Sequence, residues 1–209
     1  MSASMRIPSK RIMVPVLAAL AAVAACRPSR LEVVPVPPEV RSIEGYGSLK
    51  VLQTGGSVRS RFSFIIEAGR RGKVEILDAL NRTAAEIFLL PDEAYFVLRA
   101  DKIYWKAGPD EVIEKFLGVR LDLAEVTGLL CGRWSGGREG LRLEVRETFS
   151  GGRVPRRVEF ESPASAGTLT LLAVTFNAPA PEGSFALDFL STHAARTWDE
   201  VERILRRED

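Results

Sequence analysis

The chain has 209 residues, of which 46% are hydrophobic and 27% are charged, and its formal net charge is +2. The first 25 residues carry three basic side chains and no acid, so residues 26–209 hold 26 basic and 27 acidic residues, a net charge of −1. This balance excludes the basic footprint of a nucleic-acid-binding protein, the composition excludes a disordered chain, and the lack of later long apolar runs excludes a polytopic membrane protein.

Residues 1–25 have the pattern of a bacterial lipoprotein signal peptide. Arg6, Lys10 and Arg11 form a positive region, and the uncharged run that follows is too short to span a bilayer well. It ends in Val23-Ala24-Ala25-Cys26, which resembles a lipobox. We therefore expect Cys26 to be lipidated and to become the new N-terminus, since more than one buried acyl chain gives lasting attachment. The alternatives are an uncleaved signal anchor or a buried cysteine after a short helix.

Residues 26–41 are predicted to be a tether. The segment Val34-Pro35-Val36-Pro37-Pro38 favours an extended, semi-rigid backbone that rises about 3.1 Å per residue. Alternatively, its last few residues begin the folded domain, which is expected over residues 42–209. With Cys26 lipidated, Cys131 is the one remaining thiol, and its apolar neighbours predict a small buried side chain.

From residue 42 onward, the dominant pattern is an alternation of apolar and polar residues, which indicates β-strands. The clearest case places Leu141, Leu143 and Val145 on one face. Short turn signals separate these segments, which favours an antiparallel meander with one face toward water and one toward an apolar interior. The expected strands are residues 48–53, 58–64, 73–77, 85–90, 94–99, 102–106, 141–146, 157–161, 167–176 and 185–190.

Three short helices are expected among the strands. Pro109 suits a first helical position, and the apolar stripe that follows it ends before Gly118. Asp122 can cap the second helix. Thr197 and Glu200 form a capping-box pattern that begins the third.

Residues able to perform chemistry are sparse. His193 is the one histidine, and no cysteine or cluster of acids lies near it in the sequence, so no metal site is expected. We interpret His193 as a surface or boundary residue. The sequence has neither a phosphate-cradling glycine-rich loop nor a nucleophile elbow. We therefore expect a protein that is not an enzyme and that carries no cofactor.

The central part of the sequence resembles a known family. Residues 77–87 have the pattern of a hairpin, and they are followed by Phe116-Leu117-Gly118, by residues 119–123 and by Leu129-Leu130-Cys131-Gly132. In this order the segments are similar to the LolB family of outer-membrane lipoproteins and to the broader LolA/LolB-like superfamily. The resemblance covers most of residues 42–190.

This resemblance implies an α+β fold that is mostly β. The expected architecture is an incomplete antiparallel β-barrel, a half-barrel, with a few helices covering its open, concave side. In that family an apolar cavity between the sheet and the helices accepts acyl chains. Two positions depart from the family pattern: Asp122 stands where a proline is common, and Leu129 stands where an aromatic residue is common.

Apolar residues of the strands and helices are expected to line such a cavity. Alternatively, the same side chains fill an ordinary core, and a void of roughly 300–1,000 Å³ would favour the ligand-binding interpretation. The predicted lining residues are Phe62, Phe64, Val74, Ile76, Phe116, Leu117, Val126, Leu130, Leu141, Leu143 and Val145.

Leu80 is expected at the tip of the hairpin formed by residues 77–87. The family has an exposed leucine at the corresponding position, which is needed to insert lipoproteins into the membrane. An exposed leucine is costly in water, so contact with a membrane would give Leu80 a role. Alternatively, Leu80 folds back onto its own hairpin.

Two functions are compatible with these patterns. The first is a periplasm-facing outer-membrane lipoprotein, anchored by its N-terminal lipid, that binds acyl chains and assists lipoprotein or lipid localisation to the outer membrane. Its expected partners are the membrane, the acyl chains of lipoproteins or lipids, and a periplasmic LolA-like carrier, and it is expected to be a monomer. The alternative is a non-enzymatic scaffold lipoprotein of an envelope complex, with a filled core.

Overall fold

The computed structural model describes residues 35–53, 56–118, 120–134, 139–150, 152–163 and 165–205. The predicted signal peptide, the predicted lipidation site Cys26 and the first part of the predicted tether lie outside these residues. Within the described ranges, no helix is long and apolar enough to cross a membrane.

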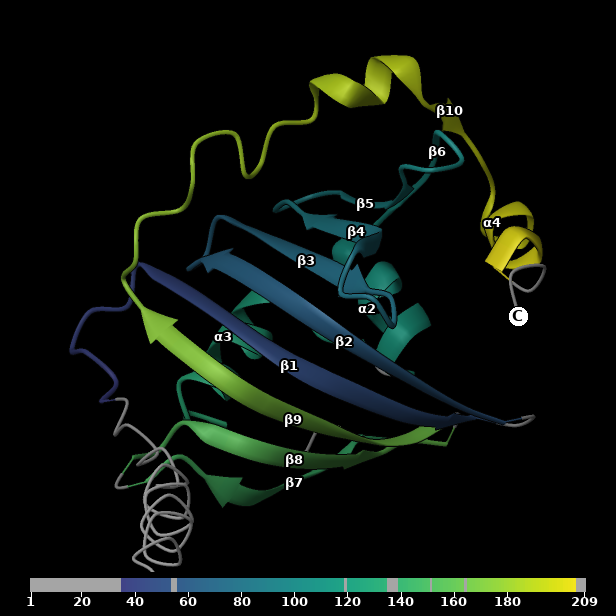
Figure 1. Ribbon diagram of the computed structural model, residues 1–209. Coiled ribbons are helices and arrows are strands. Elements are labelled where there is room, and N and C mark those ends of the chain that lie inside the picture. The colour runs from purple at the N-terminus through teal and green to yellow at the C-terminus, as the bar shows by residue number, and fades with distance from the viewer. Residues whose placement is uncertain are drawn as a thin grey trace, which may run out of the picture. The chain divides into compact units, whose positions relative to one another are not determined.

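One large sheet forms the framework of the described residues. It has the strand order β10-β6-β5-β4-β3-β2-β1-β9-β8-β7, and neighbouring strands are antiparallel except β10 with β6. The sheet is strongly curved and not closed, which confirms the predicted half-barrel (Figure 1). Its strands are β1 (Ser42–Gln53), β2 (Gly56–Glu67), β3 (Arg71–Leu77), β4 (Thr83–Leu89), β5 (Ala94–Leu98), β6 (Ile103–Ala107), β7 (Arg142–Thr148), β8 (Pro155–Glu161), β9 (Ser165–Phe176) and β10 (Ala194–Ala195).

The first strand is longer than the sequence predicted, since β1 begins at Ser42 rather than at residue 48. Its added part escapes the alternation pattern because Gly45 and Gly47 occupy positions on the concave face. Phe64 and Phe62 of β2 are their cross-strand partners. A Cβ atom would lie 2.6 Å from the Phe64 ring at Gly45 and 2.8 Å from the Phe62 ring at Gly47, so each ring needs a glycine beneath it.

The three predicted helices are confirmed as α2 (Pro109–Leu117), α3 (Leu123–Leu130) and α4 (Trp198–Leu205). Helix α2 ends at Gly118, whose φ of 70° suits glycine. Asp122 and Glu125 form a reciprocal capping box at the start of α3. The carboxylate of Glu200 accepts hydrogen bonds from the backbone N–H and the hydroxyl of Thr197 at the start of α4.

Helices α2 and α3 lie on the concave side of the sheet (Figure 1). Val112 of α2 and Val201 of α4 are fully buried in one core cluster with residues of β4, β5 and β6. A second cluster buries Leu130 and Cys131 against Ile43 and other residues of β1, β2 and β9. Cys131 is therefore a buried free cysteine, as predicted.

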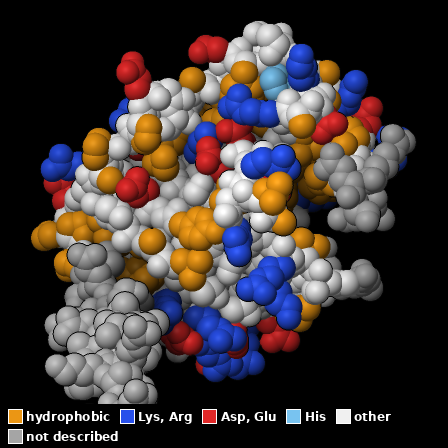
Figure 2. All heavy atoms as spheres, in the orientation of Figure 1, with side chains coloured by type: hydrophobic (Ala, Val, Ile, Leu, Met, Phe, Trp, Pro, Cys, Tyr) orange, Lys and Arg blue, Asp and Glu red, His pale blue; other side chains and the backbone are white. Residues whose placement is uncertain are grey.

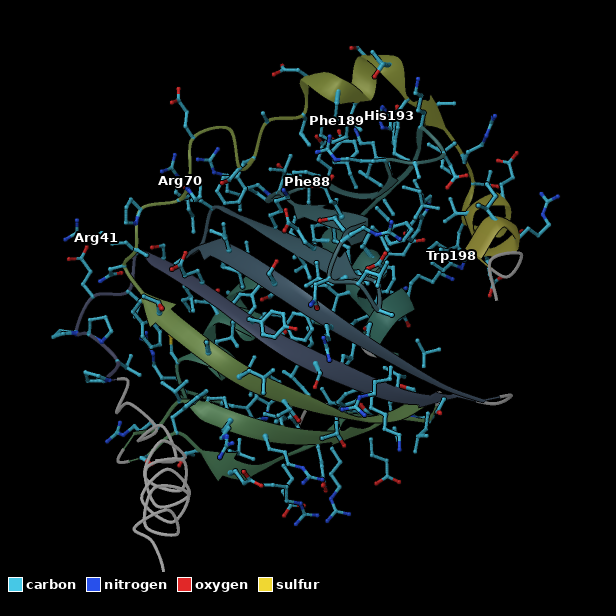
Figure 3. All side chains as sticks on the ribbon, viewed as in Figure 1. Arg41, Arg70, Phe88, Phe189, His193 and Trp198 are labelled. Carbon is cyan, nitrogen blue, oxygen red and sulfur yellow. The ribbon has the colours of Figure 1, made fainter. Side chains whose placement is uncertain are left out.

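The predicted strand over residues 185–190 is wrong. Residues Asp188–Thr192 form a short 3-10 helix, η1, which lies over the convex face of the sheet. There Phe189 contacts Phe88 of β4, with ring centroids 5.6 Å apart, and His193 lies beside them (Figure 3). The alternating apolar residues bury against a sheet face instead of pairing along a sheet edge, and alternation alone does not distinguish the two arrangements.

The last part of the predicted tether is attached to the domain. Val36 and Val40 pack against the second core cluster. The side-chain amide of Asn177 accepts a hydrogen bond from the backbone N–H of Arg41 and donates one to the carbonyl of Glu39. Residues 36–41 therefore belong structurally to the domain, and any free spacer is shorter than the predicted 26–41.

Candidate functional site

An apolar pocket lies between the concave face of the sheet and the helices α2 and α3. Its volume is about 180 Å³. Among the described residues that line it, Ser60 is the one polar side chain. The lining residues are Leu49, Ser60, Phe62, Phe64, Ile66, Val74, Ile76, Ile87, Leu89, Ile113, Phe116, Val126, Leu130, Leu169 and Leu171.

The floor of the pocket depends on the two glycines of β1. Because Gly45 and Gly47 have no Cβ, the rings of Phe64 and Phe62 lie directly against the backbone of β1. The two ring centroids are 6.0 Å apart, so the rings form a continuous apolar floor. A larger residue at either glycine would meet both a ring of β2 and a backbone carbonyl of β9, so the floor of the pocket could not keep its shape.

The roof of the pocket is held by aromatic contacts. Phe116 of α2 packs on Phe96 of β5 with ring centroids 4.9 Å apart, and it meets the ring of Trp198 edge-on at 6.0 Å. Trp198 begins α4 and also packs on Trp105, at 4.8 Å. Helix α4 therefore supports α2, which closes the pocket from above.

Seven of the predicted lining residues surround this pocket: Phe62, Phe64, Val74, Ile76, Phe116, Val126 and Leu130. Three others do not line it, which corrects the sequence-based assignment. Leu141 and Leu143 pack into the first core cluster, and Val145 is 39% exposed, because β7 is an edge strand separated from the pocket strands by β8. The side chain of Leu117 lies outside the described part of the structure.

Several lining residues were missed by the sequence-based prediction. Leu49 and Leu169 come from β1 and β9, which flank the strand carrying Phe62 and Phe64. Ile87 and Leu89 come from β4, whose residues are buried on both faces and therefore show no alternation. Once the strand order was known, these residues could have been identified, because every second residue of β1 and β4 faces the concave side.

Leu80 lies in the turn between β3 and β4, and its side chain is 71% exposed. The turn is held by Asp78, whose carboxylate accepts hydrogen bonds from the backbone N–H groups of Leu80, at 2.8 Å, and Arg82, at 2.9 Å. These hydrogen bonds, first that from the Arg82 backbone, lower the pKa of Asp78 below its ordinary value. The turn conformation is thus fixed by polar contacts, and the leucine does not fold back onto the hairpin.

A buried ionic group lies on the opposite, convex face. Glu86 is almost fully buried, and its carboxylate pairs with Lys73, at 2.8 Å, and with Arg99. Burial acts to raise the pKa of Glu86, but hydrogen bonds from Arg99 and Lys73 outweigh it and lower that pKa. The guanidinium of Arg99 also lies 4.0 Å from the ring centroid of Phe189. This group therefore joins the sheet to η1.

Metal-ligand clusters of three or more His, Cys, Asp or Glu side chains do not occur within the described ranges. His193 is half-buried beside η1, with Nδ1 2.8 Å from the carbonyl oxygen of Phe189 and the ring 5.2 Å from that of Phe189. It occupies the boundary position expected from the sequence.

Comparisons with known proteins show likeness in fold. No protein-family model matches the chain, and no curated protein matches its sequence. A solved structure of a DUF1329 family protein from Desulfovibrio piger is similar with a TM-score of 0.50 and 8% identity, covering 73% of this chain and 92% of its own. A LolA superfamily protein from Nitrosomonas europaea is similar with a TM-score of 0.47 and 11% identity, covering 75% of this chain and 94% of its own.

A putative outer membrane lipoprotein-sorting protein domain from Vibrio parahaemolyticus is also similar, with a TM-score of 0.40 and 8% identity, covering 71% of this chain and 91% of its own. At these identities the likeness concerns the fold alone. It assigns neither a ligand nor a partner to this chain.

Proposed function

We propose that this chain is a periplasm-facing outer-membrane lipoprotein that binds acyl chains and assists lipoprotein or lipid localisation to the outer membrane. The observation that carries the proposal is the pocket on the concave face. A pocket lined by fourteen hydrophobic residues and one serine has no charged group to recognise a polar ligand, and it favours an unbranched apolar chain. The proposal contains no catalytic step.

The volume of the pocket limits the size of the ligand that it can hold in this conformation. Its volume of about 180 Å³ lies below the range of roughly 300–1,000 Å³ typical of small-molecule sites. In this form the pocket therefore holds part of one acyl chain, and a longer chain would be taken in by movement of α2 and α3 away from the sheet. The helices can move in this way because α2 is held over the pocket by side-chain packing.

Anchoring and delivery belong to the same proposal. We place the lipid on Cys26 and assign the Leu80 turn to contact with the membrane that receives the client. An exposed leucine on a turn fixed by Asp78 loses little by leaving water for the bilayer interface. A periplasmic carrier that passes acylated clients to the pocket is the partner that such a function requires.

The decisive experiment measures uptake of bis-ANS by the full chain and its displacement by palmitate. Leu169→Trp on β9 places a bulky ring in the pocket, whereas Leu172→Trp on the same strand alters an exposed position that is not part of the pocket lining. We expect Leu169→Trp to abolish most of the displaceable signal and Leu172→Trp to leave it unchanged. Both variants carry the same N-terminal segment, so fluorescence from dye bound outside the pocket is the same in both and does not affect the comparison.

The small volume also favours a second candidate, a scaffold lipoprotein of the same fold that acts through its surface. In that case bis-ANS uptake is equally weak in the parent chain and in both variants, and palmitate displaces none of it. This outcome would remove the acyl-chain proposal.

A further inference from the structure

The hairpin of β1 and β2 has an unusual distribution of charge. Between Glu44 and Glu67 the sequence contains no acidic residue, although the chain has 27 in total. The same stretch contains three cations, Lys50, Arg59 and Arg61, all of which are exposed. The far half of this hairpin is therefore purely cationic.

The three cations are close together on adjacent strands. Lys50 of β1 and Arg59 of β2 are direct cross-strand partners, and Arg61 lies two residues further along β2 on the same face. Like charges placed directly opposite each other destabilise a hairpin. None of the three has an ion-pair partner among the described residues, and Arg61 donates one hydrogen bond, to the side-chain oxygen of Asn81. Among the described residues, the nearest acids in register on the same face are Glu159 and Glu161 of β8, which β9 separates from Lys50 and Leu52, so the three cations remain unpaired at the end of the hairpin.

Exposed apolar side chains accompany the cations. Leu52, 47% exposed, and Val58, 64% exposed, are near the end of the hairpin, and they project from opposite faces of the sheet. Pairing of β2 with β3 stops at Arg61, so the hairpin extends beyond its neighbour on that side. The hydrogen bond from Arg61 to Asn81 brings the Leu80 turn beside it. We call Lys50, Leu52, Val58, Arg59 and Arg61 the tip surface.

We propose that the tip surface docks on a bilayer containing anionic phospholipid. Leu52 projects from the same face as the three cations and Val58 from the opposite face, so the end of the hairpin presents apolar side chains and cations together. This combination matches a bilayer interface, where apolar groups enter the acyl boundary and cations meet anionic headgroups. An acidic protein would explain the cations but would leave the apolar Leu52 and Val58 exposed at the end of the hairpin. In Figure 2, Lys and Arg side chains stand out over the lower right of the sheet, toward the end of β1 and β2.

The tip surface is continuous with the pocket. Ser60, the polar residue of the lining, is on β2 between Val58 and Phe62. A hairpin that touches the bilayer would therefore bring one margin of the pocket to the headgroup level. This inference rests on the proposed function, because it names the surface on which the acyl chain is delivered.

The test measures quenching of an introduced tryptophan by brominated lipid. Full chains carrying Val58→Trp or Leu172→Trp are mixed with vesicles of brominated phosphatidylcholine, either alone or in equal mixture with phosphatidylglycerol. Leu172 is a matched control, being an exposed apolar residue of β9 outside the tip surface. The native tryptophans contribute equally to both samples. We expect extra quenching at position 58 in the phosphatidylglycerol vesicles, and a loss of this quenching at high salt, which screens exposed charges.

Two charge variants complete the test. In the Val58→Trp chain, Lys50→Gln with Arg59→Gln and Arg61→Gln should abolish the extra quenching. A control that removes three exposed cations near the start of the domain, Arg41→Gln with Arg133→Gln and Arg153→Gln, should retain it. Because Lys50 and Arg59 repel each other, the first variant should melt no lower than the parent, so lost quenching will not reflect unfolding.

Equal quenching at positions 58 and 172, or quenching that is indifferent to phosphatidylglycerol, would overturn the proposal. So would an equal loss in both charge variants. Palmitate displacement of bis-ANS is measured on the same chains. Intact displacement without contact at position 58 would overturn this inference alone, whereas contact without any displacement would overturn the proposed function.

Discussion

The two faces of the sheet bury the apolar side chains of β4 in different ways. On the convex face, Phe88 and Phe189 close a small cluster that is fastened by the ion pairs of Glu86. On the concave face, the side chains of Ile87 and Leu89 border a pocket of about 180 Å³. Strand β4 thus contributes to a filled cluster held by ion pairs on one side and to an unfilled apolar pocket on the other. Stability is expected to depend on the first and ligand uptake on the second.

The largest effect on stability is expected from Phe88→Ala. Phe88 is 1% exposed, and its removal leaves a cavity under η1, so the free energy of unfolding should fall by about 4 kcal/mol. Palmitate displacement of bis-ANS should persist under conditions where the variant is folded. Urea unfolding gives the first quantity. A variant that loses displacement while still folded would show that the two faces are coupled.

Glu86→Gln should have the next largest effect. It leaves Lys73 and Arg99 without their buried carboxylate, which costs about 3 kcal/mol at neutral pH. The pKa of Glu86 is lowered in the folded protein, so its contribution is present above the unfolded value of 4.5 and is lost as the pH falls through the folded value. Urea unfolding at several acidic pH values should therefore show the parent approaching the variant. A difference that is constant with pH would contradict the ionic origin.

The pH dependence has an alkaline counterpart at Lys73. Burial acts to lower the pKa of Lys73, but hydrogen bonds with Glu75 and Glu86 outweigh it and raise that pKa. A raised pKa means that the contribution is present below the unfolded value of 10.5 and is lost as the pH rises through the folded value. The convex cluster should therefore be most stable between the two ordinary values.

On the concave face, Phe62→Ala should change ligand uptake and stability in opposite directions. It removes a ring from the floor of an existing pocket, so we expect a loss of about 2 kcal/mol, less than for Phe88→Ala. The enlarged pocket should take up more bis-ANS and should retain palmitate more tightly. Fluorescence titration checks the uptake, with Leu172→Ala as an exposed apolar control on β9. Reduced uptake would indicate that the ring is needed as a contact surface.

Features of the fold that depend on local sequence signals could be predicted from the sequence. Helices α2, α3 and α4 were predictable because the residues at their starts, Pro109, Asp122 and Thr197, are local signals. Most strands followed from alternation, but the start of β1 did not, because Gly45 and Gly47 carry no side chain to alternate. The role of these glycines becomes clear only in the folded sheet, where Phe64 and Phe62 of the next strand lie over them.

The pocket was predictable in its residue types and only partly in its membership. Phe62, Phe64 and Phe116 were found because they stand out in their own segments, whereas Leu49 and Leu169 depend on the order of strands in the sheet. The same dependence misplaced Val145, which belongs to an edge strand. Volume depends on the distance between helices and sheet, and no sequence pattern specifies that distance.

Leu80→Glu is expected to change stability least and function most. The side chain is 71% exposed, and the turn is held by hydrogen bonds to Asp78 that do not involve the leucine side chain, so the melting temperature should be nearly unchanged. The substitution removes the apolar side chain that would enter the acyl boundary, so transfer of an acylated client from the protein to vesicles should slow strongly. Leu172→Glu, which places the same charge at an exposed position of β9, should leave transfer unaffected. A large drop in melting temperature would mean that Leu80 is part of the core. Unchanged transfer would leave the tip surface of β1 and β2 as the membrane contact, and the two hairpins would then differ in role although they lie side by side.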